Sequence, residues 1–223
     1  MTGIRQRLDA LRAELDAELR ACGREPGSVR VLAVSKKHPA EAILEACRAG
    51  LDAFGENYVQ EAAAKFADPL LAGIPFEKHF IGHVQTNKAR QLAELFDVVQ
   101  SVDRPDAARA LGRAAERAGR PLRVLLQLNV SPSDRFGCPP AEAPALAAAI
   151  RAEPALRLDG VMAMGPLGEP HEIAEAFALA AKTFGIVGGS TLSIGMSGDW
   201  RAAVRAGSTM VRIGTALFGE RST

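Results

Sequence analysis

Two lysines follow the first strongly apolar segment of the chain. Lys36 and Lys37 come directly after residues 31–35, a continuous apolar run typical of a parallel strand buried on both faces. A lysine at the end of a buried strand is costly to desolvate, and desolvation favours the neutral, nucleophilic form of an amine. Such an amine can form a Schiff base with a carbonyl compound. The alternative is that both lysines are solvated loop residues.

Two small-residue turns near the end of the chain indicate a site for an anion. Ser197 and Thr215 each follow a short apolar segment, with Gly198 and Gly214 beside them. Each stands where the N-cap of a following helix is expected. The N-terminus of a helix offers unpaired backbone N–H groups and the positive end of the helix dipole, so it favours phosphate. The alternative is that both residues are plain N-caps without a ligand.

Other predicted strands also carry polar side chains near their carboxyl ends. Arg212 alternates with Met210 and Gly214, so all three are expected on one face of the last strand. The alternative for Arg212 is a salt bridge at the rim of the fold. His79 lies in a buried segment, where a lone histidine is more often a hydrogen-bonded core residue than an acid or base.

The elements that must position these residues alternate between short apolar strands and alanine-rich helices. Apolar residues at spacings of three and four predict an amphipathic helix over residues 4–22. Strands are predicted to start near residues 31, 52, 78, 97, 123, 158, 191 and 210. This repetition indicates an α/β fold, a single (β/α)8 TIM-type barrel with an additional N-terminal helix. The alternative is an open doubly wound sheet, but no G-x-G-x-x-G follows the first strand.

The predicted barrel places the two small-residue turns after its seventh and eighth strands. That is where (β/α)8 barrels commonly build a phosphate site. Lys36, at the end of the first strand, would lie at the same end of the barrel. A lysine able to form a Schiff base, together with a separate phosphate site, is what pyridoxal 5'-phosphate (PLP) requires.

Composition narrows the remaining possibilities. The 223 residues are 48% hydrophobic and 24% charged, as in an ordinary globular protein, and we expect one domain over residues 1–223. The net charge of +1 gives no reason to expect a nucleic acid or an anionic membrane as partner. The 3 cysteines show neither metal-ligand spacing nor a disulfide framework, so we expect no metal and a cytoplasmic location.

Several motifs resemble one known family in order and over essentially the whole chain. The chain is similar to the YggS/PROSC family of PLP homeostasis proteins, which are related to the N-terminal barrel of bacterial alanine racemase. The motifs that carry the resemblance are residues 33–36, 54–57, 79–82, 85–88, 192–197 and 208–219.

The resemblance implies a role for each candidate site residue. It places the Schiff base on Lys36 and the guanidinium of Arg212 at the pyridine nitrogen, with Asn57 lining the cofactor. A cation at that nitrogen disfavours its protonation, so the ring is a poor electron sink. The cofactor-binding residues expected in this way are Lys36, Asn57, Met196, Ser197, Arg212, Gly214 and Thr215. No residue is expected to be catalytic.

The resemblance also implies a carrier and not an enzyme. A carrier would hold PLP and buffer it or deliver it, with PLP-dependent apo-enzymes as candidate partners and a monomer or weak dimer as its state. The alternative is an amino-acid racemase, which needs two bases; in alanine racemase one is a tyrosine of a C-terminal domain that we do not expect here. A class I aldolase is a third candidate. His38 and Arg135 stand where relatives often carry basic residues or lysine, which puts any accessory lysine site in doubt.

Overall fold

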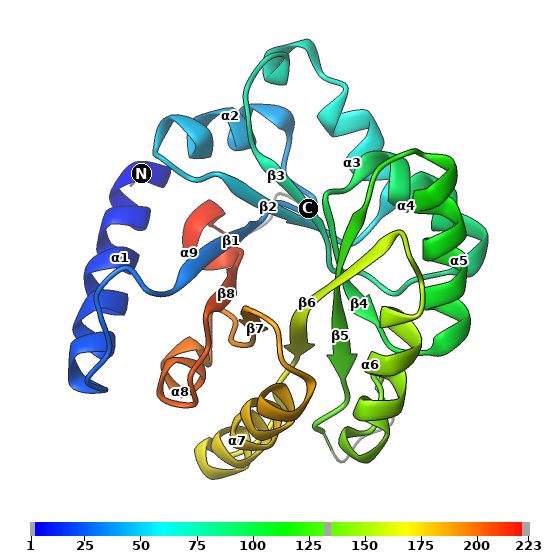
Figure 1. Ribbon diagram of the computed structural model, residues 1–223. Helices are drawn as coiled ribbons and strands as arrows, with labels where there is room; N and C mark the ends of the chain where they lie inside the picture. The colour runs from blue at the N-terminus through cyan, green and yellow to red at the C-terminus, as the bar shows by residue number, and fades with distance from the viewer. Residues whose placement is uncertain (1–2, 132–134, 220–223) are drawn as a thin grey trace.

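The computed structural model describes residues 3–131 and 135–219, in which eight parallel strands close into a barrel in sequence order (Figure 1). Each strand pairs with the next, and β8 pairs with β1 to close the ring. This confirms the predicted (β/α)8 barrel and excludes the open sheet. The strands are β1 (Arg30–Val34), β2 (Ala53–Glu56), β3 (Glu77–Phe80), β4 (Val98–Val102), β5 (Leu122–Leu128), β6 (Leu156–Ala163), β7 (Thr191–Ser193) and β8 (Met210–Ile213).

Helices surround the strands on the outside (Figure 1). They are α1 (Ile4–Ala21), α2 (Ala40–Arg48), α3 (Val59–Phe66), α4 (Ala89–Leu95), α5 (Pro105–Arg117), α6 (Ala143–Arg151), α7 (Pro170–Val187), α8 (Trp200–Arg205) and α9 (Thr215–Phe218). Short 3-10 turns occur at η1 (Pro69–Leu71), η2 (Thr86–Lys88) and η3 (Pro140–Glu142).

Helix α1 precedes the barrel, as predicted, and covers its outer surface beside α8 and α9. Its apolar stripe, with Leu8 and Leu19 fully buried, packs against α2, α8 and α9. Arg24 extends this contact by donating hydrogen bonds to the carbonyl oxygens of Val204 and Ser208. The helix therefore stabilises the β8–β1 junction from outside.

The core has a thick outer layer and a small inner one. Strand residues that face outward pack against the helices, while Leu32, Ala53 and Met210 form a separate cluster inside the barrel. Most strand residues are thus buried on both faces, which explains why apolar residues predominate in strands such as β1 and β5. The inside of the barrel also holds polar side chains, among them His79 and Arg212.

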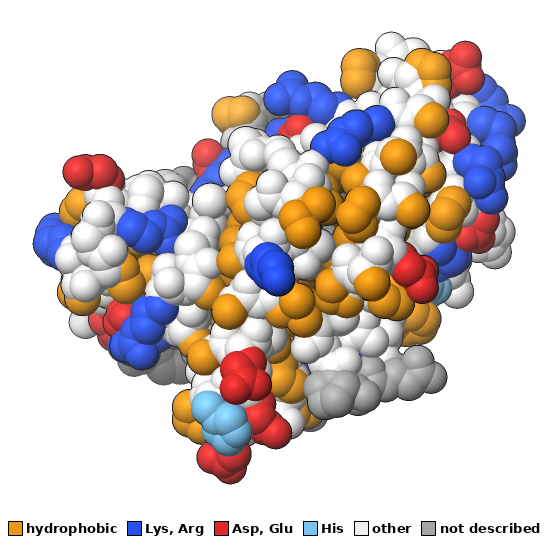
Figure 2. Space-filling model, turned by 60° about the horizontal axis from the view of Figure 1, so that its bottom comes forward, with side chains coloured by type: hydrophobic (Ala, Val, Ile, Leu, Met, Phe, Trp, Pro, Cys, Tyr) orange, Lys and Arg blue, Asp and Glu red, His pale blue; other side chains and the backbone are white. Residues whose placement is uncertain are grey.

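The face of the molecule shown in Figure 2 has no dominant charge of either sign. Side chains of Lys and Arg and of Asp and Glu are spread among hydrophobic ones over the face shown in Figure 2. Of the helices within the described ranges, none has the combination of length and apolar character that crossing a membrane requires.

Candidate functional site

The turn after β1 separates the two lysines. Lys36 is half-buried, whereas Lys37 is exposed and adopts a left-handed backbone conformation with φ of 63°. A positive φ is uncommon for a residue with a side chain, so surrounding contacts must hold this turn in place. Further along the turn, the His38 ring stacks on the Phe218 ring of α9 with centroids 4.9 Å apart. The β1 turn therefore lies beside the turn that follows β8.

A buried ion pair fixes the backbone on either side of Lys36. Lys65 of α3 donates hydrogen bonds to Glu56 Oε1 at 2.6 Å, to the Ser35 carbonyl at 2.8 Å and to Glu61 Oε1 at 3.0 Å. The Ser35 hydroxyl donates to the same Glu56 oxygen at 2.8 Å, and the Lys37 amide donates to Glu61. The residues before and after Lys36 are thus both tied to one cluster.

Burial dominates the electrostatics of that cluster. Glu56 is fully buried, and desolvation raises the pKa of its carboxyl although hydrogen bonds from Lys65 and Ser35 oppose the rise. Its second oxygen, Oε2, has no hydrogen-bond partner within the described part of the chain. Glu56 therefore supports the Lys36 turn through contacts with its neighbours.

Arg212 lies on β8 with its guanidinium buried in the barrel. Its Nη1 donates to the Ser193 carbonyl at 2.6 Å and to the Ser193 hydroxyl at 2.9 Å, and its Nη2 donates to the Ala163 carbonyl at 2.9 Å. Burial lowers the pKa of Arg212 to about 10, with Asp199 opposing the shift, so the group stays cationic at neutral pH. The alternative of a rim salt bridge is wrong: no carboxylate in the described ranges pairs with Arg212.

The turn after β7 differs from the prediction in one respect. The N-cap of α8 is Asp199 and not Ser197, because the chain makes an extra turn before the helix begins. The Asp199 carboxylate accepts a hydrogen bond from the Met196 amide at 2.5 Å, and the Asp199 amide donates back to the Met196 carbonyl at 3.1 Å. Ser197 is half-buried at the tip of this turn, and neither its amide nor that of Gly198 donates to an acceptor in the described ranges.

The turn after β8 corrects the second predicted cap. Gly214 is the N-cap of α9, and Thr215 is its first residue, with an exposed side chain. A Cβ atom on Gly214 would lie 3.4 Å from the carbonyl oxygen of Val34 in β1. A Cβ atom at this position would make ordinary van der Waals contact, so the distance shows that the two chain segments are neighbours. This contact brings the turn after β8 against the strand that ends in Lys36.

Asn57 follows β2 and offers an unpaired polar atom. Its side-chain oxygen Oδ1 is buried and accepts no hydrogen bond in the described part of the chain. Asn57 lines a cavity of about 200 Å³ together with Tyr58, His83 and Gln85. A Cβ on Gly82 would come within 2.1 Å of the Asn57 carbonyl oxygen, so glycine is required there. The backbones of Asn57 and Gly82 are therefore closely packed.

Three polar residues inside the barrel are connected to Arg212 by hydrogen bonds. His79 is buried and hydrogen-bonded, which confirms the prediction of a core histidine. Gln100 and Ser193 are fully buried and were missed by the sequence analysis. The signal in the sequence was a polar residue within an apolar strand. Whether such a side chain points into the barrel can be decided only once the strand register is known.

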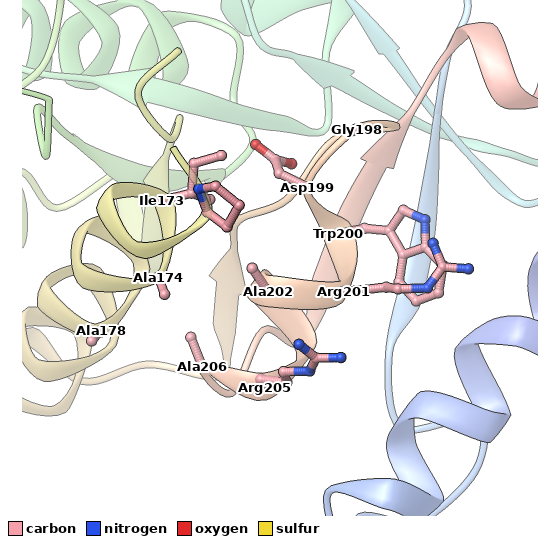
Figure 3. A pocket seen from close by; sticks show the side chains of 11 residues that line it. Ile173, Ala174, Ala178, Gly198, Asp199, Trp200, Arg201, Ala202, Arg205 and Ala206 are labelled. Carbon is pink, nitrogen blue, oxygen red and sulfur yellow. The ribbon is translucent and has the colours of Figure 1, made fainter. Parts of the chain in front are cut away.

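A groove of about 490 Å³ lies apart from Lys36, between α7 and α8 (Figure 3). Its walls are mainly apolar and include Ile173, Ala174 and Ala202, with Asp199 at one edge. No group of three or more potential metal ligands occurs within the described ranges. The residues predicted from the sequence thus offer a lysine amine, a buried guanidinium and the backbone of two glycine-containing turns.

Comparison with known proteins places this barrel in a class. The family described as the alanine racemase N-terminal domain matches residues 6–222. A solved alanine racemase of Clostridium difficile 630 shares the fold with a TM-score of 0.70 at 14% identity, over 94% of this chain and 56% of that chain.

Relatives of higher identity define the family more narrowly. The pyridoxal phosphate homeostasis protein of Pseudomonas aeruginosa is 45% identical over 228 residues, covering 99% of this chain and 97% of that protein. The same-named protein of Escherichia coli K12 is 43% identical over 99% of this chain and 98% of its own length. PipY of Synechococcus elongatus PCC7942, solved with PLP bound, is 40% identical with a TM-score of 0.81 over 93% of this chain and 100% of that chain. The chain belongs to the family of pyridoxal phosphate homeostasis proteins.

Proposed function

We propose that residues 1–223 form one PLP-binding domain that holds PLP as a Schiff base on Lys36 and buffers or delivers it, without a dedicated reaction of its own. One observation carries the proposal: the turn that contains the half-buried Lys36 lies against the turn after β8 that contains Gly214. The buried cation Arg212 is part of β8 itself. PLP-dependent apo-enzymes would be the recipients. The solved structure of the relative PipY with PLP bound supports PLP as the ligand.

The described side chains fit such a ligand. Ser197 and Thr215, with the amides around Met196 and Gly214, would hold the phosphate, since the amides of Ser197 and Gly198 have no acceptor within the described ranges. Asn57 would contact the ring through its buried, unpaired Oδ1. PLP, when bound, supplies a carbonyl carbon for the lysine and an electron-withdrawing ring.

Arg212 favours holding PLP over racemisation. Its cationic guanidinium would face the pyridine nitrogen and disfavour protonation there, because like charges repel. A racemase also needs a base on each face of the substrate carbon. Tyr58, the chain's single tyrosine, is 55% exposed and precedes α3, on the cavity beside Asn57. These observations support a carrier.

Absorbance titration with PLP tests the proposal. Wild-type protein should develop the visible band of a protonated Schiff base, and Lys36→Ala should abolish it. Lys37→Ala is the matched control. The side chain it removes is exposed, and the hydrogen bond from the Lys37 backbone amide to Glu61 stays in place. A band retained in Lys36→Ala and lost in Lys37→Ala would overturn the assignment.

Incubation with L-alanine in deuterated water tests the carrier against the racemase. The α-proton should exchange slowly and without inversion, because Lys36 could act as a single base. Rapid inversion, followed by NMR and chiral chromatography, would restore the racemase.

A further inference from the structure

A chain of hydrogen bonds runs through the inside of the barrel from Arg212 to the opposite end. Arg212 Nη1 donates to Ser193 Oγ at 2.9 Å, and Ser193 Oγ donates to Gln100 Oε1 at 2.7 Å. Gln100 Nε2 lies 2.8 Å from His79 Nδ1, and His79 Nε2 lies 2.8 Å from Glu77 Oε2. The chain thus joins strands β8, β7, β4 and β3.

The partners fix one direction of donation along the whole chain. The guanidinium can only donate, so the Ser193 hydroxyl accepts from Arg212 and turns its own proton to Gln100 Oε1. The Gln100 amide then donates to His79 Nδ1. At the far end an ionised Glu77 can only accept, so His79 must carry its proton on Nε2. One neutral tautomer of His79 satisfies every link.

The far end of the chain is anchored by charge. Glu77 pairs with Arg30 of β1 and Arg123 of β5. The hydrogen bond from His79, with these two arginines, holds the pKa of Glu77 down to about 2, so the carboxylate is ionised at neutral pH. Burial in turn lowers the pKa of His79, in agreement with a neutral ring. Glu77 therefore remains an ionised hydrogen-bond acceptor for His79 at neutral pH.

The chain occupies space that apolar side chains would normally fill. Ser193 and Gln100 are fully buried, and His79 is 1% exposed. A buried polar network is tolerated when each member has its partners, and it then specifies one arrangement of its side chains. Here that arrangement ends on a guanidinium whose partners are neutral oxygens, so its charge is not cancelled by a contacting carboxylate.

We propose that Ser193, Gln100 and His79 are positioning residues for Arg212: they hold its guanidinium in one orientation and keep its positive charge directed to the ligand. The inference rests on the proposed PLP site, in which Arg212 faces the ring. It adds that the orientation of this cation is set from the opposite end of the barrel.

The first test removes the middle link. Gln100→Leu leaves Ser193 Oγ without its acceptor and His79 Nδ1 without its donor. We expect PLP binding to weaken about tenfold and the absorbance band to shift, because the variant breaks two buried hydrogen bonds and disconnects Ser193 from His79. Gln127→Leu is the matched control, because Gln127 is also a buried strand glutamine but donates to the Phe136 carbonyl. Wild-type affinity and spectrum in Gln100→Leu would overturn the proposal.

A second test does not depend on PLP. Nitrogen-15 NMR of the apo-protein should show His79 as the neutral Nε2–H tautomer; an Nδ1–H tautomer would overturn the directed chain. In Gln100→Glu the ring lies between two carboxylates, so His79 should take up a second proton at neutral pH. An unchanged His79 in that variant would also contradict the chain. If wild-type protein binds no PLP but His79 has the expected tautomer, the proposed function is wrong while the directed chain of hydrogen bonds is supported.

Discussion

Two buried cations, one on each side of the β1–β8 junction, are held in opposite ways. Lys65 contacts two carboxylates, Glu56 and Glu61, whereas the hydrogen bonds of Arg212 within the described residues go to carbonyl and hydroxyl oxygens. A cation neutralised by carboxylates can fix a backbone turn but has little field left for a ligand. A cation held by neutral oxygens keeps its field. Lys65 therefore fixes the position of the turn that contains Lys36, and Arg212 supplies the positive charge that acts on a ligand.

The largest expected effect is the loss of stability on breaking the buried ion pair between Lys65 and Glu56. Lys65→Met leaves Glu56 buried without its cation, and breaking a buried ion pair by removing one partner costs about 3–5 kcal/mol. Urea denaturation should show this loss in the free energy of unfolding. Arg90→Met is the control: the Arg90–Glu94 pair is exposed and should change stability by less than about 1 kcal/mol. Equal effects of the two variants would mean that the buried pair does not hold the Lys36 turn.

Replacing the hydroxyls at the two turns should have an intermediate effect on ligand binding. Ser197→Ala and Thr215→Ala should each weaken PLP binding by about 1–3 kcal/mol, the range for hydrogen bonds to a charged group. Isothermal titration with PLP and with pyridoxal, which lacks the phosphate, separates this loss from a general change in fold. A double variant that binds PLP as tightly as wild type would place the phosphate elsewhere.

The remaining prediction concerns the sign of the pH dependence, which should be opposite for Glu77 and Glu56. The pKa of Glu77 is lowered from 4.5 to about 2, so its stabilisation is present above pH 4.5 and is lost as pH falls toward 2. The pKa of Glu56 is raised, so its ionisation destabilises the fold as pH rises from 4.5 through the folded-state value. Glu77→Gln should flatten the acid loss, and Glu56→Gln should flatten the change above pH 4.5. Equilibrium unfolding at several pH values measures both, and the same sign for both variants would contradict this account.

Much of the fold could be predicted because it depends on local patterns. Apolar runs marked most of the strand positions, since most strand residues are buried, and the stripe of α1 marked the first helix. Strand β3 is different, because its first two residues, Glu77 and Lys78, are charged and only partly buried. Lys36 and Arg212 were identified because they stand at or near strand ends. The burial of His79 was expected from its place beside a predicted buried strand.

The remaining features depend on contacts between distant segments. Asp199 and Gly214 replaced the expected caps because the N-cap is set by where the chain turns, not by which residue could cap. Nothing in the sequence distinguishes Lys65 from other helix lysines, and only the fold brings Glu56 into contact with it. Gln100 and Ser193 are 93 residues apart, and only the closed barrel brings them into contact.

Borohydride reduction of the PLP-loaded protein, followed by peptide mapping, tests the central claim most directly, because reduction turns a Schiff base into a stable covalent bond. The account predicts one pyridoxyl group, on the peptide that contains Lys36, at wild-type level in Lys37→Ala and absent in Lys36→Ala. Labelling found only at Lys37 or Lys88, or no labelling of a protein that binds PLP, would contradict it.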